Sequence, residues 1–498
     1  MNVNPITRLD YPDPDVIRVE DTYYMVSTTM HFMPGCEILQ SFDLVHWEHV
    51  TYVYETLDHT DAQQLKSGHN IYGQGMWAAS LRYHEGRFCI CFVANDTRKT
   101  YLYTSEKIDG PWKKQLIEGF YHDGSLLFDE DGRNYIVYGN DEIWITELNE
   151  DLTAPKKDGL HRLLVSDHKN PELGYEGSHI QKINGYYYIF LIHSLRDRWM
   201  RTEACFYSDS LEGEFTGGDV LCDDRGYCGQ GVAQGGIVDT PDGKWYAMLF
   251  QDSGAVGRIP ILLPVTWKDH FPFFGQNGHV PEEIEVHSTR PGYIYQPLVG
   301  SDDFCNGLLP HWQFNHDPDP RYYHLDALQG TYTITTREVC TELTQAVNTL
   351  TQRMSYPSCA AEVTVDASAL KEGDVAGLCA LQSCYAAVGI TKHHGKYEVL
   401  MLDKKEDGIL DMTEGTVVES HQMDFRLEAD FCNMKDEARC YYRVNKGDWL
   451  PIGTVHKLYF KLDHFTGCRF GLFCYAAEET GGSACFRDFK YYDVDEIS

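Results

Sequence analysis

The first 255 residues repeat one pattern of polar and hydrophobic positions. In each copy a polar or glycine-containing turn leads into aromatic residues and then into an apolar run. Turn residues followed by β-branched and aromatic runs are typical of β-hairpins. The copies begin 65, 46, 53 and 58 residues apart, and each interval leaves room for about four short strands with their loops. They are residues 20–27, 85–91, 131–137, 184–190 and 242–248.

A second element follows several copies and keeps step with the first. It is a serine or threonine turn with acidic residues that closes on a large apolar side chain, at residues 41–47, 104–112 and 208–215. Four-stranded units repeated around an axis form a β-propeller, so five units predict a five-bladed one. The alternative is a β-sandwich whose hairpins are alike by chance.

The innermost strand of each propeller blade lines the central channel. Five residues lie 10 to 12 positions before the repeated aromatic residue of their blade: Asp13, Trp77, Asp123, Glu176 and Gln234. The pattern therefore predicts a ring of three carboxyl groups, one indole and one amide. Like charges in a confined site raise one another's pKa values, and such clusters mark functional sites. The alternative is a set of hydrogen-bonded polar residues that plug the channel.

Three carboxyl groups at one site suit hydrolysis of a glycosidic bond. One protonated carboxyl gives its proton to the leaving oxygen, and a second activates water or attacks carbon. A third acid near the proton donor can hold the donor in its protonated form. The same three groups could instead bind a metal, and without a histidine in the ring a hard cation such as calcium would be preferred over zinc.

The repeat stops where the sequence becomes rich in glycine, proline and aspartate, between residues 292 and 309. Short strand-like segments follow, and residues 361–365 and 425–429 alternate between apolar and polar positions. Such alternation with polar turns predicts a two-sheet sandwich. We therefore expect an all-β chain, with a propeller domain over residues 1–295 and a sandwich domain over residues 300–498.

Composition and charge restrict the partners. With 498 residues, 43% hydrophobic and 23% charged, the composition is that of a globular protein and excludes disordered, fibrous and membrane classes. The formal charge of −33 repels nucleic-acid phosphates and anionic lipids, whereas a neutral sugar is not repelled. The 16 cysteines have irregular spacings, and the N-terminus lacks a secretory signal pattern. We expect a cytoplasmic protein with free thiols, and a secreted form whose leader has been removed is the alternative.

Several separated strings, in order along nearly the whole chain, resemble glycoside hydrolase family 43. They are residues 10–15 (DYPDPD), 33–47 (MPGCEILQSFDLVHW), 76–80 (MWAAS), 123–128 (DGSLLF) and 176–180 (EGSHI). They are most similar to β-xylosidases and α-L-arabinofuranosidases that carry a C-terminal β-sandwich. Residues 310–316 and 486–491 resemble the concanavalin-like sandwich of those enzymes, which packs on the propeller and narrows the mouth of the active site.

The resemblance implies an inverting exo-hydrolase that releases xylose from the non-reducing end of β-1,4-xylo-oligosaccharides, with α-L-arabinofuranosidase side activity. A dedicated α-L-arabinofuranosidase, a retaining enzyme and a non-catalytic carbohydrate-binding propeller are the alternatives. By the same resemblance Asp13 is the general base, Glu176 the general acid, and Asp123 the residue that tunes the acid. Whether the protein forms a homo-oligomer stays open.

Four further residues carry weaker expectations from the resemblance. Trp77 forms a wall of the sugar pocket, Phe32 is a substrate-binding aromatic residue, and Arg258 reaches sugar hydroxyls and a catalytic carboxylate. Core packing and a surface ion pair are the alternatives for Trp77 and Arg258. Many relatives hold a hydrated calcium ion with a histidine at the fifth ring position, where this chain has Gln234. An amide oxygen can also serve calcium, so the ion stays open, and the chemistry itself needs no cofactor.

Overall fold

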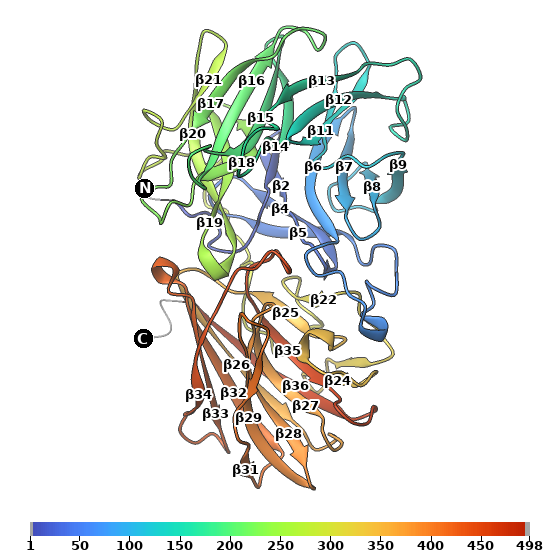
Figure 1. The fold of residues 1–498 in the computed structure, drawn as a ribbon, viewed down its shortest axis with the longest axis vertical. Coiled ribbons are helices and arrows are strands. Elements are labelled where there is room, and N and C mark those ends of the chain that lie inside the picture. Colours follow the sequence, from blue (N-terminus) through green and yellow to red (C-terminus); the bar gives the residue numbers. More distant parts are fainter. Residues whose placement is uncertain (1–2, 494–498) are drawn as a thin grey trace.

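The computed structural model describes residues 3–493, which form two β domains stacked along the long axis of the molecule (Figure 1). Within these residues the only helical segments are 3₁₀ turns of three residues each, at Lys66–Gly68, Gly254–Val256, Leu343–Gln345 and Cys432–Met434. None of the described helices has the length and apolar character needed to cross a membrane. Because all other regular elements of these residues are β-strands, the all-β prediction is confirmed.

The first domain is a five-bladed propeller, as the repeats predict. Each blade is a four-stranded antiparallel sheet, and each predicted repeat supplies the turn between the first two strands of its blade. The innermost strand of the last blade contacts that of the first blade, which closes the ring. The blades are β1 (Asp15–Val19), β2 (Thr22–Val26), β4 (Gly35–Ser41) and β5 (Glu48–Tyr54); β6 (Met76–His84), β7 (Arg87–Ala94), β8 (Lys99–Ser105) and β9 (Lys113–Ile117); β10 (Ser125–Phe128), β11 (Asn134–Asn140), β12 (Glu142–Leu148) and β13 (His161–Ser166); β14 (Glu176–Ile183), β15 (Tyr186–Ser194), β16 (Arg201–Ser208) and β17 (Thr216–Leu221); and β18 (Val232–Asp239), β19 (Trp245–Asp252), β20 (Arg258–Lys268) and β21 (Phe271–Phe274).

A buried polar network ties the inner strands of three blades together inside the channel. Asp15 accepts a hydrogen bond from Arg82 Nη1 at 2.8 Å, and its other oxygen lies 3.2 Å from His179 Nδ1. Burial alone would raise the pKa of Asp15, but the Arg82 guanidinium and His179 hold that pKa below its usual value. These side chains lie two or more residues further along the inner strands than the predicted ring residues, and Asp15 and His179 are buried there.

The second domain is a sandwich of two antiparallel sheets. One sheet has the order β3-β22-β25-β35-β27-β28-β29-β30, with β31 also paired to β29, and the other has the order β23-β24-β36-β26-β32-β33-β34. Their strands are β3 (Phe32–Met33), β22 (Gln313–Asn315), β25 (Leu350–Arg353), β35 (Arg469–Tyr475), β27 (Val375–Leu381), β28 (Ala386–His393), β29 (Lys396–Lys404), β30 (Leu410–Met412) and β31 (Thr416–Val418), and β23 (Tyr323–Asp326), β24 (Thr331–Thr335), β36 (Ser483–Asp493), β26 (Ser358–Asp366), β32 (Gln422–Asp430), β33 (Glu437–Arg443) and β34 (Leu450–Lys457).

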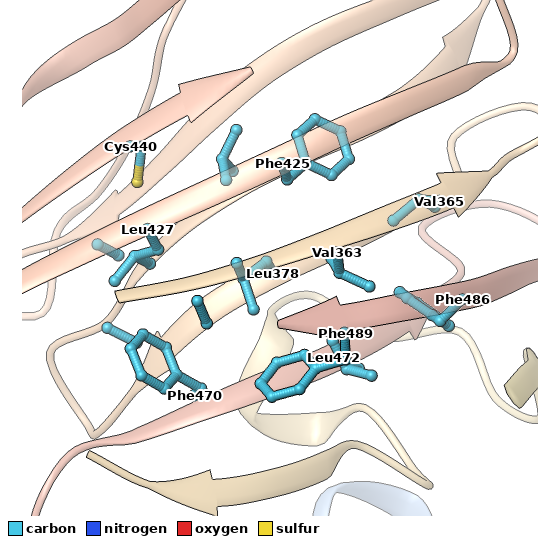
Figure 2. Packing of buried hydrophobic residues seen from close by; sticks show 14 of the residues in the cluster. Val363, Val365, Leu378, Phe425, Leu427, Cys440, Phe470, Leu472, Phe486 and Phe489 are labelled. Atoms are coloured by element: carbon cyan, nitrogen blue, oxygen red, sulfur yellow. The ribbon is translucent and has the colours of Figure 1, made fainter. Parts of the chain in front are cut away.

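The core of the sandwich is made by the inward-facing residues of both sheets (Figure 2). Val363 and Phe425 from one sheet pack with Leu378 and Leu472 from the other, and all four are buried. Strand β32 alternates between buried and less buried positions, as the sequence predicts for a sheet with one wet face, whereas β26 is buried throughout residues 359–363. The predicted limits of the two domains stay predictions; the last propeller strand ends at Phe274, and β22 begins at Gln313.

The two domains share a sheet, which the sequence did not predict. Strand β3 belongs to the chain of the first blade, yet it pairs with β22 and becomes an edge strand of the sandwich. Close by, Arg353 of the sandwich forms a buried ion pair with Glu37 of the propeller at 2.8 Å. Burial would raise the pKa of Glu37, but Arg353 and His49 lower it to about 2. Shared backbone hydrogen bonds and a shared ion pair fix the domains against each other.

Removing the cation of this pair should destabilise the whole protein. Arg353→Met leaves the Glu37 carboxylate buried without its counter-ion, and we expect the free energy of unfolding in urea to fall by about 3–5 kcal/mol. The double variant Glu37→Gln, Arg353→Met removes the stranded charge and should regain part of that loss. A fall of less than about 1 kcal/mol in the single variant would mean that the pair does not hold the domains together.

Candidate active site

The five predicted ring residues line one cavity of about 300 Å³. The structure thus brings Asp13, Trp77, Asp123, Glu176 and Gln234 together, each from a different blade. The cavity lies at the open end of the propeller channel, and a loop of the sandwich closes one side of it. Offsets of 10 to 12 residues along the chain therefore correspond to one place in space, because each blade presents its innermost strand to the same axis.

Local backbone irregularities turn these side chains toward the cavity. Asp13, Asp123 and Gln234 have φ angles of 54°, 48° and 60°, in the left-handed region that non-glycine residues seldom adopt. In β6, β14 and β18 the pairing register shifts beside Trp77, Glu176 and Gln234. Such bulges add a residue to one strand and re-aim a side chain. All five ring positions thus depart from regular strand geometry, as is common at functional sites.

Asp13 is held by two donors on one side of the cavity. Arg258 Nη1 donates a hydrogen bond to one carboxylate oxygen at 2.9 Å, and Thr28 Oγ1 donates to the other at 2.5 Å. The Arg258 guanidinium lies over the rings of Phe250 and Phe465, at 5.2 and 4.4 Å from their centres. Within residues 3–493, Nε and Nη2 of Arg258 are buried and have no hydrogen-bond partner, so they are free to donate to a ligand.

Asp123 and Glu176 lie close to each other in the same cavity, with His122 beside both. His122 Nε2 lies 3.5 Å from Asp123 Oδ2 and 3.6 Å from Glu176 Oε2, and the ligand atoms of all three lie within 4.8 Å of one another. Glu176 Oε2 also accepts a hydrogen bond from Asn140 Nδ2 at 2.7 Å, and Asp123 Oδ2 accepts one from the Gly177 amide at 2.9 Å. The two carboxyl groups are therefore close enough for the charge on one to affect the protonation of the other.

The charges in the cavity nearly cancel. Burial raises the pKa of Asp123 to about 6; His122 opposes that shift, and Glu176 and Asp13 add to it. Burial lowers the pKa of His122, but Asp123, Glu176 and Asp13 outweigh burial and raise it to about 9. Two cations, His122 and Arg258, thus face three carboxyl groups, and one proton on the acids makes the group neutral. A buried site favours that neutral arrangement, which leaves two carboxylates and one protonated carboxyl group.

The donor set of this cavity gives no specific support for a calcium ion. Calcium takes six to eight oxygen ligands, mostly carboxylates, carbonyls and water. Among the described residues, Gln234 offers one neutral amide, and the group of three potential ligands in the cavity is His122, Asp123 and Glu176, which includes an imidazole with a raised pKa. The prediction of calcium therefore gains no support, and no step below depends on a metal.

Phe32 differs from its predicted role as a substrate contact. It does not line the cavity; its exposed fraction is 1%, and the Arg469 guanidinium covers its ring at 3.4 Å. The reason is that Phe32 lies on β3, which joins the sandwich sheet and carries the ring into the domain interface. Met30, two residues earlier in the same loop, lines the cavity instead. Trp77 does line the cavity, and its Nε1 has no hydrogen-bond partner among the described residues.

Sequence reasoning missed several residues of the cavity. His122 directly precedes Asp123 and could have been found as its neighbour, and Asn140 ends the strand that pairs with β10. Leu462 and Phe465 come from the sandwich, more than 280 residues beyond Glu176, and no local pattern marks them. Long-range folding alone brings them to the ring.

The loop that carries Leu462 and Phe465 is fixed to the propeller. His464 stacks on Tyr72 with ring centres 3.8 Å apart and planes 1° apart, and the Gly467 amide donates a hydrogen bond to Asp10 Oδ2 at 2.8 Å. Burial lowers the pKa of His464 to about 3, so this ring is neutral and packs as an aromatic group. The sandwich therefore forms a fixed wall of the cavity.

The propeller cavity holds carboxylates that are balanced by cations and a carboxyl group that keeps a proton. These are the groups that hydrolysis of a glycosidic bond needs, so the site is of the glycosidase class. Comparison with known proteins agrees with that class. Residues 3–272 match the model of glycosyl hydrolases family 43, and residues 301–492 match the beta xylosidase C-terminal concanavalin A-like domain. The chain belongs to glycosyl hydrolases family 43 and is a glycosidase.

Relatives and solved structures cover between 82% and 99% of this chain. A beta-xylosidase of Formosa agariphila is 26% identical over 99% of this chain and 89% of its own length. A non-reducing end alpha-L-arabinofuranosidase of Bacteroides ovatus is 24% identical over 82% of this chain and 79% of its own. A bifunctional GH43-CE structure from Bacteroides eggerthii is 42% identical with a TM-score of 0.93; it matches 99% of this chain, which spans 64% of that longer chain.

Removing the imidazolium of His122 should move the pH profile of the enzyme. The alkaline limb of kcat/KM reports the loss of the proton that the acids of the cavity hold, and burial raises the pKa of one of these acids, Asp123, to about 6. Without the cation the acids hold that proton more tightly, so in His122→Gln we expect the limb to move upward by about one unit. His84→Gln, on the inner strand β6 of another blade and outside this cavity, should leave the limb unchanged. A limb that stays in place in His122→Gln would refute this electrostatic role.

Proposed function

We propose that this glycosidase is an inverting exo-enzyme that releases xylose from the non-reducing end of β-1,4-xylo-oligosaccharides, with α-L-arabinofuranosidase side activity. The observation that supports it most is the charge arrangement of the cavity: Asp13 paired with Arg258, and Asp123 and Glu176 beside His122. The names of the relatives, which include beta-xylosidases and an arabinofuranosidase, agree with these two substrate classes.

In this mechanism Asp13 accepts a proton from the attacking water. Arg258 and Thr28 orient its two oxygens, so that one geometry of the carboxylate is favoured. Glu176 donates a proton to the leaving oxygen, and Asn140 fixes the orientation of its carboxyl group. Asp123 lies beside Glu176, and its negative charge favours the protonated form of this acid. The products are xylose and the shortened oligosaccharide.

The exo mode rests on the shape of the cavity. A volume of about 300 Å³ lies at the lower end of the range of ligand pockets, and the polar network around Asp15 fills the channel beyond it. Leu462 and Phe465 of the sandwich wall the cavity at one side. Such a closed site takes the end of a chain and leaves no path for a polysaccharide to pass through.

A dedicated α-L-arabinofuranosidase is the second candidate, and membership of a glycosidase family argues against a non-catalytic sugar-binding propeller. Both sugars are neutral pentoses with similar hydroxyl patterns. The ratio of kcat/KM for nitrophenyl β-xyloside and nitrophenyl α-L-arabinofuranoside decides between them. A small neutral glycoside is the expected partner in either case, and a cytoplasmic location remains a proposal from the sequence.

The stereochemical course of the reaction tests the inverting mechanism. A proton-NMR time course on xylobiose should show the α anomer of the newly released xylose first, because water attacks on the face opposite the leaving group. The β anomer appearing first would show retention and would remove Asp13 from the role of base. The same spectra show whether xylobiose is a substrate at all.

The roles of the two acids should separate by leaving group. Glu176→Ala lacks the proton donor, and we expect kcat on xylobiose to fall by about 10²–10⁴ while an aryl xyloside with an acidic leaving group loses far less. Asp13→Ala lacks the base, so both substrates should lose activity to a similar degree. Equal losses on both substrates in Glu176→Ala would contradict its role as the acid.

A further inference from the structure

A buried carboxylate outside the catalytic cavity binds the backbone of both domains. Asp10 precedes the first propeller strand and has an exposed fraction of 5%. One of its oxygens, Oδ1, accepts a hydrogen bond from the Arg258 amide at 2.7 Å. The other, Oδ2, accepts the hydrogen bond from the Gly467 amide of the sandwich loop at 2.8 Å. Because Asp10 does not line the cavity, it can affect the reaction only through such partners.

The backbone of Arg258 is held at both of its polar groups. Its amide donates to Asp10, and its carbonyl accepts a hydrogen bond from the Tyr11 amide at 3.0 Å. Gly257 makes the close contact possible, because a Cβ atom there would lie 2.3 Å from Asp10 Oδ1, and its φ of 108° is one that other residues seldom adopt. The side chain of Arg258 then reaches Asp13 at 2.9 Å. The placement of the guanidinium at the proposed base therefore begins at Asp10.

The second contact of Asp10 fixes the aromatic ring that covers the same guanidinium. Gly467 lies two residues after Phe465, whose ring centre lies 4.4 Å from the guanidinium carbon of Arg258. A Cβ atom at Gly467 would lie 2.1 Å from the Val256 carbonyl oxygen, so the sandwich loop lies directly against the segment that leads to Arg258. One carboxylate thus holds both the strand that carries the arginine and the loop that carries the ring over it.

The main chain of Asp10 is bound to the domain interface as well. Its carbonyl oxygen accepts a hydrogen bond from Arg353 Nε at 2.9 Å, and Arg353 is the sandwich residue that pairs with Glu37 of the propeller. Asp10 lies only three residues before Asp13. The segment that carries the proposed base and the strand that carries its arginine are therefore attached to the sandwich at the same place.

We propose that Asp10 is a positioning residue for the hydrolysis, and that it couples docking of the sandwich to the placement of Arg258 at Asp13. A carboxylate has two acceptor oxygens, so it can bind one amide from each domain at the same time, which an asparagine side chain cannot do. A displacement of about 1 Å at a catalytic group can lower a rate about 10²-fold. The inference rests on the proposed function, because it explains how the base and its arginine are held.

A double-mutant cycle with Arg258 tests the coupling. Asp10→Asn keeps the size of the side chain but turns an NH₂ group toward one of the two amides, so we expect kcat/KM for nitrophenyl β-xyloside to fall about 10- to 100-fold. In the Arg258→Met background the same substitution should lower kcat/KM by less than about threefold, because the guanidinium through which Asp10 acts is absent. Equal losses in both backgrounds, or no loss in either, would overturn the coupling.

A matched control is a buried aspartate of the sandwich that also accepts two hydrogen bonds. Asp302 is exposed by 4% and lies outside the cavity, and its oxygens accept from the Phe304 amide at 2.7 Å and from Trp312 Nε1 at 2.8 Å. Asp302→Asn should lower the melting temperature as Asp10→Asn does, but should leave kcat/KM within twofold of the wild type. A tenfold loss of kcat/KM in Asp302→Asn would show that general loosening of the fold lowers activity, and would overturn the specific role of Asp10.

Hydrogen exchange in the wild-type protein gives a readout that does not depend on activity. Since one carboxylate binds both amides, the segments around Arg258 and Gly467 should open in one event, and their protection factors should agree within about tenfold. A larger difference would overturn the coupling, even if Asp10→Asn did not fold. If the wild type cleaved no glycoside, the proposed function would fail by itself, and the exchange measurement would still decide whether Asp10 couples the two segments.

Discussion

Compensation of charge in a small buried cavity is the constraint on which the active site of this glycosidase depends. Three carboxyl groups cannot all ionise within a few ångströms of one another unless cations balance them. Arg258 takes one carboxylate and His122 faces the other two, so that a single proton completes the balance. The same balance provides the two protonation states that acid–base cleavage of a glycosidic bond needs. Binding and chemistry thus follow from one electrostatic arrangement.

The propeller meets this constraint by geometry that each blade supplies alone. Its innermost strands converge on one axis, and a left-handed residue or a bulge at the start of each strand aims a side chain into the channel. The strain of these positions is tolerated because four hydrogen-bonded strands hold each blade in place. Further along the channel, Asp15 and Arg82 satisfy each other, so the interior stays filled and the cavity stays shallow.

The sandwich is part of the active site as well as a neighbour of it. Strand β3 of the first blade completes a sandwich sheet, and the Glu37–Arg353 ion pair is buried between the domains. These contacts keep the loop of Phe465 and Leu462 at the cavity, where Phe465 covers the guanidinium of Arg258. The wall of the substrate site and the stability of the domain interface are therefore linked.

The sequence by itself determined the five blades and the sandwich, because hairpin turns and strand periodicity are local properties. It also determined that Asp13, Asp123 and Glu176 meet, because each repeat places its residue at the start of an innermost strand, next to the same axis. Only the tertiary structure decided the remainder. Phe32 lies outside the predicted site because β3 pairs with a strand about 280 residues away. His122 is a cation because three neighbouring acids raise its pKa. The sandwich loop lies at the cavity because the two domains dock there. Pairing across domains and the field of several charges arise from contacts between distant segments, which no local pattern encodes.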